Sequence, residues 1–147
     1  MKGTVAFIFF MLFLAGIAFV NLRGMQEGTQ VTSVEQLIDV AWRPTHIGEM
    51  AIDEQTTMTL QFDSDNRING MGGCNRYFGS FEFTDAKLSV GMVGSTRMAC
   101  DSSDGAFEIA YLEALGNTRN AIRLEERLAL KDSDENTIAR FVAIPRE

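Results

Sequence analysis

The segment from Asn69 to Cys100 constrains the fold of this chain more than any other. Each end of it carries one of the only two cysteines, Cys74 and Cys100. Three glycines lie within the four residues before Cys74, so the backbone must turn sharply there or pass close to another part of the molecule. The aromatic-rich run from Tyr77 to Phe83 then predicts a β-strand. The sequence therefore predicts a glycine turn that leads into a strand.

Charge excludes two classes of partner. The 147 residues carry a net charge of −7, and from Glu27 onward there are 20 acidic and 11 basic residues. A sequence-independent hold on nucleic acid needs lysine and arginine to replace counterions, so no nucleic-acid partner is expected. The same sign disfavours docking on anionic lipid through a basic patch. The length suits one domain with a hydrophobic core.

The N-terminus predicts delivery to a membrane. Lys2 is followed by an uncharged run from Gly3 to Val20. This run fits either a cleaved signal peptide, with Gly16 and Ala18 near the cut, or an uncleaved signal anchor. Residues 1–22 are therefore expected to export the rest of the chain from the cytoplasm or to anchor it in the membrane. No cysteine comes directly after the apolar run to accept a lipid.

A linker and a short helix are expected before the domain. Residues 23–33 are polar and dotted with glycine, which is typical of a linker. Residues 33–40 suit one or two helical turns, capped by Thr32 or Ser33 with an acceptor from Glu35 or Gln36. The expected divisions are thus 1–22 for the membrane segment, 23–40 for linker and lead-in, and 41–147 for the domain.

The domain itself alternates between short strands and one helix. Pro44 confines the first strand to an edge or a bulge. Apolar spacings of three and four predict a helix from Ser102 or Ser103 to about Arg119, with Gly116 and Asn117 as a candidate stop. The expected strands are 41–47, 56–62, 67–70, 77–83, 87–90 with an extension to 98, 121–124, 127–131 and 137–144. This order predicts an α+β fold, with a mostly antiparallel, strongly curved sheet or small open barrel and the helix packed across it.

These residues together resemble the META domain, also called the HslJ-like heat-shock domain. The resemblance spans roughly residues 41–144. It rests on the elements Asn69–Asn75, Tyr77–Phe81, Lys87–Val90 and Ser95–Cys100, with Trp42 near the start, Glu108, Leu112 and Leu115 on the helix, and Leu128–Leu130 on a late strand. It implies a small bacterial envelope domain, mixed α+β and largely antiparallel, linked to heat or drug stress. The resemblance brings no established catalytic residues with it.

The cysteines admit three interpretations. Outside the cytoplasm a Cys74–Cys100 disulfide is the expected state, and closing its loop of 25 residues stabilises by roughly 3–3.5 kcal/mol. Buried free thiols are the alternative. A reactive thiol would need an electropositive, accessible setting, which Arg76 and Arg97 beside the motif would supply. Zinc is one ligand short with two cysteines and the lone His46, so no metal or other cofactor is expected.

A polar set, Asn75, Arg76, Thr96 and Arg97, remains as a candidate binding surface. Asn75 and Thr96 suit either this role or that of satisfying backbone groups of the turn. His46 is the only ready base near neutral pH, and no neighbour in the sequence orients it toward a nucleophile.

Two functions follow as hypotheses. The first is a non-enzymatic domain outside the cytoplasm that supports stress or drug tolerance by binding an envelope component. The second is a small barrel whose surplus aromatic side chains line a pocket for an apolar ligand. A thiol or hydrolytic enzyme at Cys74 or Cys100 is a more distant alternative.

Overall fold

A computed structural model describes residues 28–99 and 102–145. Three stretches lie outside these ranges. They are residues 1–27, which hold the predicted membrane segment and the start of the linker, residues 100–101, which include Cys100, and residues 146–147. No helix within the described ranges is long and apolar enough to cross a membrane.

Among the described residues, ten strands form one antiparallel sheet, in the order β1-β8-β9-β10-β2-β4-β5-β6-β7, with β3 paired to β2. Their bounds are β1 Thr29–Gln30, β2 Ala41–Ile47, β3 Met50–Ala51, β4 Leu60–Phe62, β5 Arg67–Met71, β6 Arg76–Thr84, β7 Lys87–Ser95, β8 Asn120–Leu124, β9 Arg127–Lys131 and β10 Thr137–Ile144. The α+β, antiparallel prediction is confirmed.

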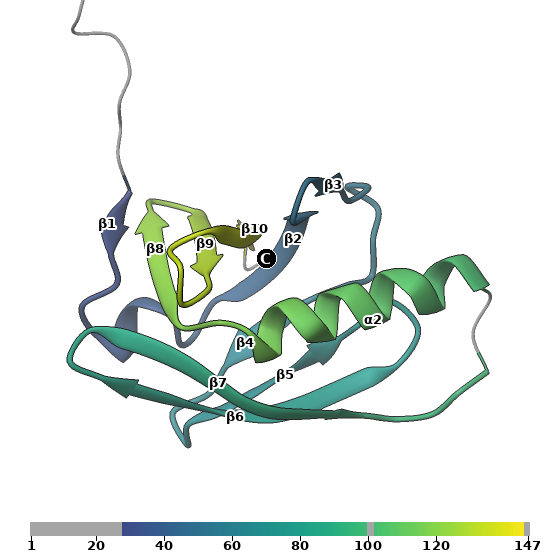
Figure 1. Ribbon diagram of the computed structural model, residues 1–147, viewed down its shortest axis with the longest axis horizontal. Coiled ribbons are helices and arrows are strands. Elements are labelled where there is room, and N and C mark those ends of the chain that lie inside the picture. Colours follow the sequence, from purple (N-terminus) through teal and green to yellow (C-terminus); the bar gives the residue numbers. More distant parts are fainter. Residues whose placement is uncertain (1–27, 100–101, 146–147) are drawn as a thin grey trace, which may run out of the picture.

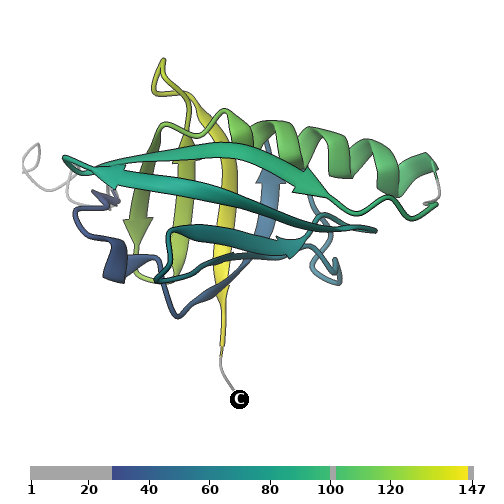
Figure 2. The ribbon, with the colours of Figure 1, turned by 90° about the horizontal axis from the view of Figure 1, so that it is seen from below.

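The sheet is strongly curved and open, and the long helix α2 (Ser102–Gly116) lies across it (Figure 1). Strands β8, β9, β10 and β2 run across the direction of β6 and β7 (Figure 2). The curvature brings β7, at one end of the sheet order, next to the start of β8 near the other end, where the Val90 amide donates to the Thr118 carbonyl at 3.3 Å. The helix and this contact enclose the core.

The interior of the curved sheet is filled by large side chains. Trp42 and Tyr111 are fully buried, and Tyr77, Phe81 and Phe141 are at most 2% exposed. Along β6, Tyr77 and Phe81 point inward while Phe78, Ser80 and Glu82 are exposed, as expected for a strand with one buried face. An apolar ligand inside the sheet would have to displace these side chains.

Pro44 lies in the middle of the sheet and not at its edge. Strand β2 pairs with β10 on one side and with β3 and β4 on the other. The β2–β10 register slips where His46 faces Arg140 but Pro44 faces Phe141, which leaves Thr45 as the extra residue of a bulge. The bulge alternative of the sequence prediction is thus correct and the edge alternative is wrong.

Strand β4 is shorter than the expected 56–62. The Thr59 carbonyl is occupied by two tyrosine hydroxyls, and the Thr59 hydroxyl accepts from the Met71 amide at 3.1 Å. The Thr59 amide still donates to the Met71 carbonyl at 3.0 Å, but its carbonyl and hydroxyl do not continue the ladder before Leu60. The helix ends at Gly116, at the expected glycine stop, and Thr118 folds back so that its hydroxyl donates to the Ala114 carbonyl at 3.2 Å.

The segment before β2 is tied to the sheet from Thr29 onward. β1 pairs with β8, and Val31 is buried, so the sheet begins inside the stretch expected to be linker. The lead-in helix is a single 3-10 turn, Val34–Gln36, with the predicted capping box between Ser33 and Gln36. Arg123 stacks on the Trp42 ring at 5.2 Å and donates to the Gln36 carbonyl, which fixes this turn against β8.

Candidate functional site

A buried carboxylate lies at the centre of the glycine-turn region. Glu108, on the inner side of α2, is 7% exposed, and Asn75, which follows the turn, is 6% exposed. The Asn75 backbone amide donates to Glu108 Oε2 at 2.7 Å, and the Asn75 side-chain amide donates to Oε1 at 3.0 Å. Both carboxylate oxygens are therefore used to hold the start of β6 under the helix.

The other side of Asn75 holds the segment that follows β7. Its Oδ1 accepts the Met98 amide at 2.7 Å and the Thr96 hydroxyl at 3.0 Å. Thr96 Oγ1 in turn accepts the Arg76 amide at 3.2 Å. One asparagine thus joins the helix, the glycine turn and the β7 exit. We call these three residues, Asn75, Thr96 and Glu108, the asparagine clamp.

The glycines before Cys74 make room for this arrangement. A Cβ on Gly72 would lie 2.9 Å from the Glu108 Cγ, and one on Gly70 would lie 2.0 Å from the Thr59 carbonyl oxygen. Gly73 has a φ of 124°, a conformation that favours glycine. Close approach at Gly70 and Gly72, and a left-handed backbone at Gly73, explain the cluster.

A buried pair of tyrosines stabilises the region around the glycine turn. The hydroxyls of Tyr77 and Tyr111 are 3.2 Å apart, and both donate to the Thr59 carbonyl, at 2.8 and 3.2 Å. The rings meet edge to face at 5.7 Å between centroids. Burial raises the pKa of both tyrosines well above the ordinary value near 10.

Alkaline titration should report this burial directly, because the chain has only two tyrosines. The folded state keeps both tyrosine protons, while the unfolded state loses them near pH 10. The free energy of unfolding is therefore unaffected by these groups below that pH and falls as the pH rises above it. We expect tyrosinate absorbance to appear only together with the loss of folded circular dichroism. Tyrosinate that forms while the circular dichroism is unchanged would contradict the described burial.

The predicted polar set divides into two parts. Asn75 and Thr96 come together in the asparagine clamp, so their side chains satisfy the turn as the structural interpretation expected. Arg76 and Arg97 are exposed beside them. The sequence indicated Glu108 only as part of the family resemblance and gave it no partner. The signal for its burial was its spacing, since residues 108, 111 and 115 share the buried helix face.

The predicted Cys74–Cys100 disulfide stays a prediction, because Cys100 lies outside the described residues. The bond between the Met98 amide and Asn75 brings the chain two residues before Cys100 next to the residue after Cys74. His46 lies on β2, and its Nδ1 is 3.3 Å from the Thr45 hydroxyl. Within residues 28–99 and 102–145 no group of three His, Cys, Asp or Glu side chains is arranged to hold a metal.

Comparison with known proteins identifies the family. The family model of the META domain matches residues 35–144. The chain belongs to the META domain family. This confirms the resemblance, and it places the asparagine clamp, the glycine turn and the tyrosine pair within the META domain.

Two solved structures share the META-domain fold of this chain. An NMR structure of a protein from Burkholderia xenovorans is 26% identical, with a TM-score of 0.66 over 84% of this chain and 94% of that one. A second NMR structure is 18% identical, with a TM-score of 0.57 over 75% of this chain and 93% of that one. No protein of curated function matches.

The META domain also has a cleft outside its filled core. A cavity of about 450 Å³ lies between the loop Ala51–Met58, Gly73 of the glycine turn and Phe107 of α2. Met58 is buried there, and the Thr57 hydroxyl donates to the Gly73 carbonyl at 2.9 Å. This cleft, and not the interior of the sheet, offers space for a small molecule.

Proposed function

We propose that this META domain is a non-enzymatic module outside the cytoplasm that supports stress or drug tolerance by binding another envelope component. The observation that carries the proposal is the contrast between the clamp, at the ends of β6 and β7, and the outer face of these two strands. The clamp's side chains are used in internal hydrogen bonds, while neighbouring apolar side chains face solvent. Phe78 is 53% exposed and Met92 is 92% exposed.

These side chains form one surface. Phe78 faces Gly94 across the β6–β7 pair, and a Cβ on Gly94 would lie 3.3 Å from the Phe78 ring. Alternation along each strand puts Arg76 and Phe78 on one outer face of β6, and Met92 and Gly94 on the same face of β7. We call these four residues the β6–β7 patch. Exposed aromatic and methionine side chains beside arginine are typical of protein-binding surfaces.

Photo-crosslinking in stressed cells tests this proposal. A benzophenone amino acid at position 78 should form a discrete protein adduct with the full chain. Position 109 is the matched control, because Ile109 is also an exposed apolar residue, 70% accessible, but lies on α2. Equal adducts at both positions, or none at position 78, would contradict a specific surface at the patch.

The cleft favours a second candidate, the binding of a small apolar ligand. Met58 and Phe107 would contact the apolar part, and Thr56 and Gln55 on the loop would contact its polar atoms. Titration with the neutral dye Nile red should then show saturable fluorescence that Phe107→Ala reduces. A signal that does not saturate, or that the variant leaves unchanged, removes this candidate.

A further inference from the structure

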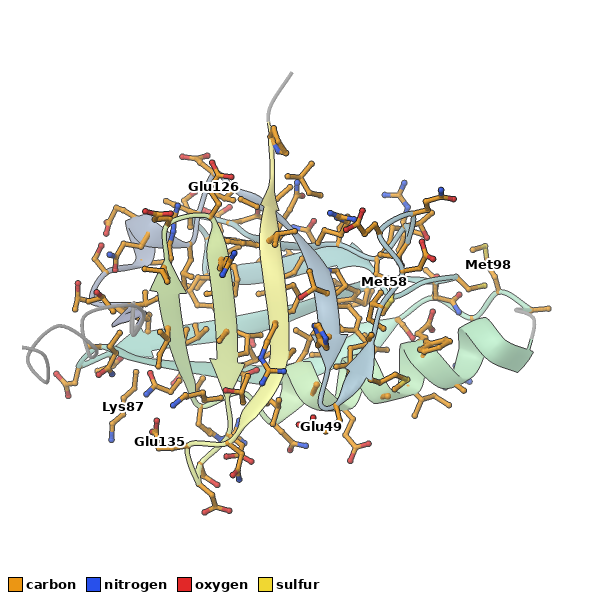
Figure 3. All side chains as sticks on the ribbon, turned by 90° about the horizontal axis from the view of Figure 1, so that it is seen from above. Glu49, Met58, Lys87, Met98, Glu126 and Glu135 are labelled. Atoms are coloured by element: carbon orange, nitrogen blue, oxygen red, sulfur yellow. The ribbon has the colours of Figure 1, made fainter. Side chains whose placement is uncertain are left out.

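The acidic charge of the chain is not spread evenly over the sheet. Strands β2, β8, β9 and β10 contain no aspartate or glutamate. The cationic side chains on these four strands are Arg43, His46 (when protonated), Arg123, Arg127, Lys131 and Arg140. Three of the nearby acidic residues, Glu49, Glu126 and Glu135, lie in turns at the strand ends (Figure 3). This part of the sheet is therefore basic in a chain of net charge −7.

Several of these cations gather on the outer side of the sheet. Leu128, Leu130, Ala139 and Phe141 are buried in the core, so alternation turns Arg127 and Arg140 outward. Around them the outer side is hollowed into a mostly apolar trough of about 440 Å³. Its lining includes Ile122, Leu124, Val142, His46, Arg127 and Arg140. We call this surface the basic outer face.

Among the described residues, no ion pair neutralises the charge of Arg127 or Arg140. Lys131 and Glu135, 3.5 Å apart, form the only ion pair among the described residues. Arg127 and Arg140 are exposed and have no carboxylate within ion-pair distance there. An anionic group on the basic outer face would thus meet two guanidinium groups beside an apolar surface, a combination that suits an amphiphile.

The chain enters the described domain at the same place. Gly28, the first described residue, lines the trough, and a Cβ on it would lie 2.5 Å from the Ile122 side chain. The predicted membrane segment ends only a few residues before Gly28. As an uncleaved anchor, the predicted membrane segment would hold the basic outer face within reach of lipid headgroups.

We propose that the basic outer face binds anionic phospholipid of the bilayer to which the chain is tethered. The phosphate contacts Arg127 and Arg140, and the trough receives the adjoining apolar part of the lipid. The net charge of the whole chain disfavours docking on anionic lipid. The local charge of the basic outer face is positive, however, and favours it. This proposal does not depend on the β6–β7 patch, which lies on other strands.

Hydroxyl-radical footprinting of the full chain in nanodiscs tests the proposal. Discs of phosphatidylcholine are compared with discs that also contain phosphatidylglycerol. We expect labelling of Leu124 and Val142 to fall severalfold only with the anionic lipid, while labelling of the exposed Met92 on β7 is unchanged. Each basic residue near anionic lipid contributes about a fivefold preference. Arg127→Glu with Arg140→Glu should therefore abolish the protection.

Arg67→Glu with Arg97→Glu is the matched variant, because these exposed arginines lie on β5 and after the end of β7. It should keep the protection. The proposal is overturned if both lipid compositions protect equally, if neither does, or if both double variants behave alike. Protection that appears without lipid as the protein concentration rises would assign the basic outer face to a second copy of the chain instead.

Discussion

Replacing Glu108 with alanine lowers the free energy of unfolding by about 3–5 kcal/mol. The carboxylate accepts two hydrogen bonds from Asn75, at 2.7 and 3.0 Å, in a site that is 7% exposed. A hydrogen bond to a charged group contributes about 1.5–3 kcal/mol, and the alanine variant also leaves the two Asn75 donors buried without an acceptor. Denaturant unfolding followed by circular dichroism measures the loss.

Two further variants make the Glu108 result specific. Glu108→Gln keeps the shape and one acceptor oxygen, but turns an amide donor toward Asn75, so we expect it to lose about half as much. Glu113→Ala removes an exposed carboxylate from the same helix and should change stability by less than about 0.5 kcal/mol. If Glu108→Ala were as mild as Glu113→Ala, the asparagine clamp would not hold the fold as described.

Gly70→Ala should cost about 3 kcal/mol or more, although it adds a single carbon atom. That carbon would lie 2.0 Å from the Thr59 carbonyl oxygen and 2.9 Å from the Tyr77 hydroxyl. The nearest atom is backbone, so relief requires β5 to move away from Thr59 and breaks the bonds of both tyrosines to this carbonyl. Overpacking and the lost hydrogen bonds add together.

Gly105→Ala is the matched control for Gly70→Ala. Gly105 lies in α2 with nothing within 4 Å of its added Cβ. Alanine there should stabilise the helix by up to about 1 kcal/mol. A thermal melt of the two variants separates a steric effect at Gly70 from a general effect of glycine replacement. Equal midpoints for the two would show that the Gly70 contact is not tight.

Local patterns predicted the hairpins of this fold well. Strands β6 and β9 lie where the alternation of apolar and polar residues predicted them, because one face of each is buried and the other is exposed to solvent. The limits of β4 were wrong because tyrosines 18 and 52 residues away in the sequence occupy the Thr59 carbonyl. Contacts of that range leave no local signal in a single sequence.

The candidate site was predicted in part for the same reason. Asn75 and Thr96 stood out because they flank the cysteines in a motif. Glu108 did not stand out as a buried partner, since it lies 33 residues from Asn75 and resembles an ordinary acidic residue near a helix start. The basic outer face was hidden by the net charge, which averages over strands that only the folded sheet places side by side.

Survival under heat or drug stress tests the central claim most directly. Cells that carry Phe78→Ser with Met92→Ser are compared with wild type and with a deletion, and the abundance of the full chain is measured by immunoblot. Both side chains are exposed, so the variant should fold and accumulate as wild type does. We expect survival to fall to the level of the deletion. Wild-type survival of this variant at equal abundance would contradict a binding role for the β6–β7 patch.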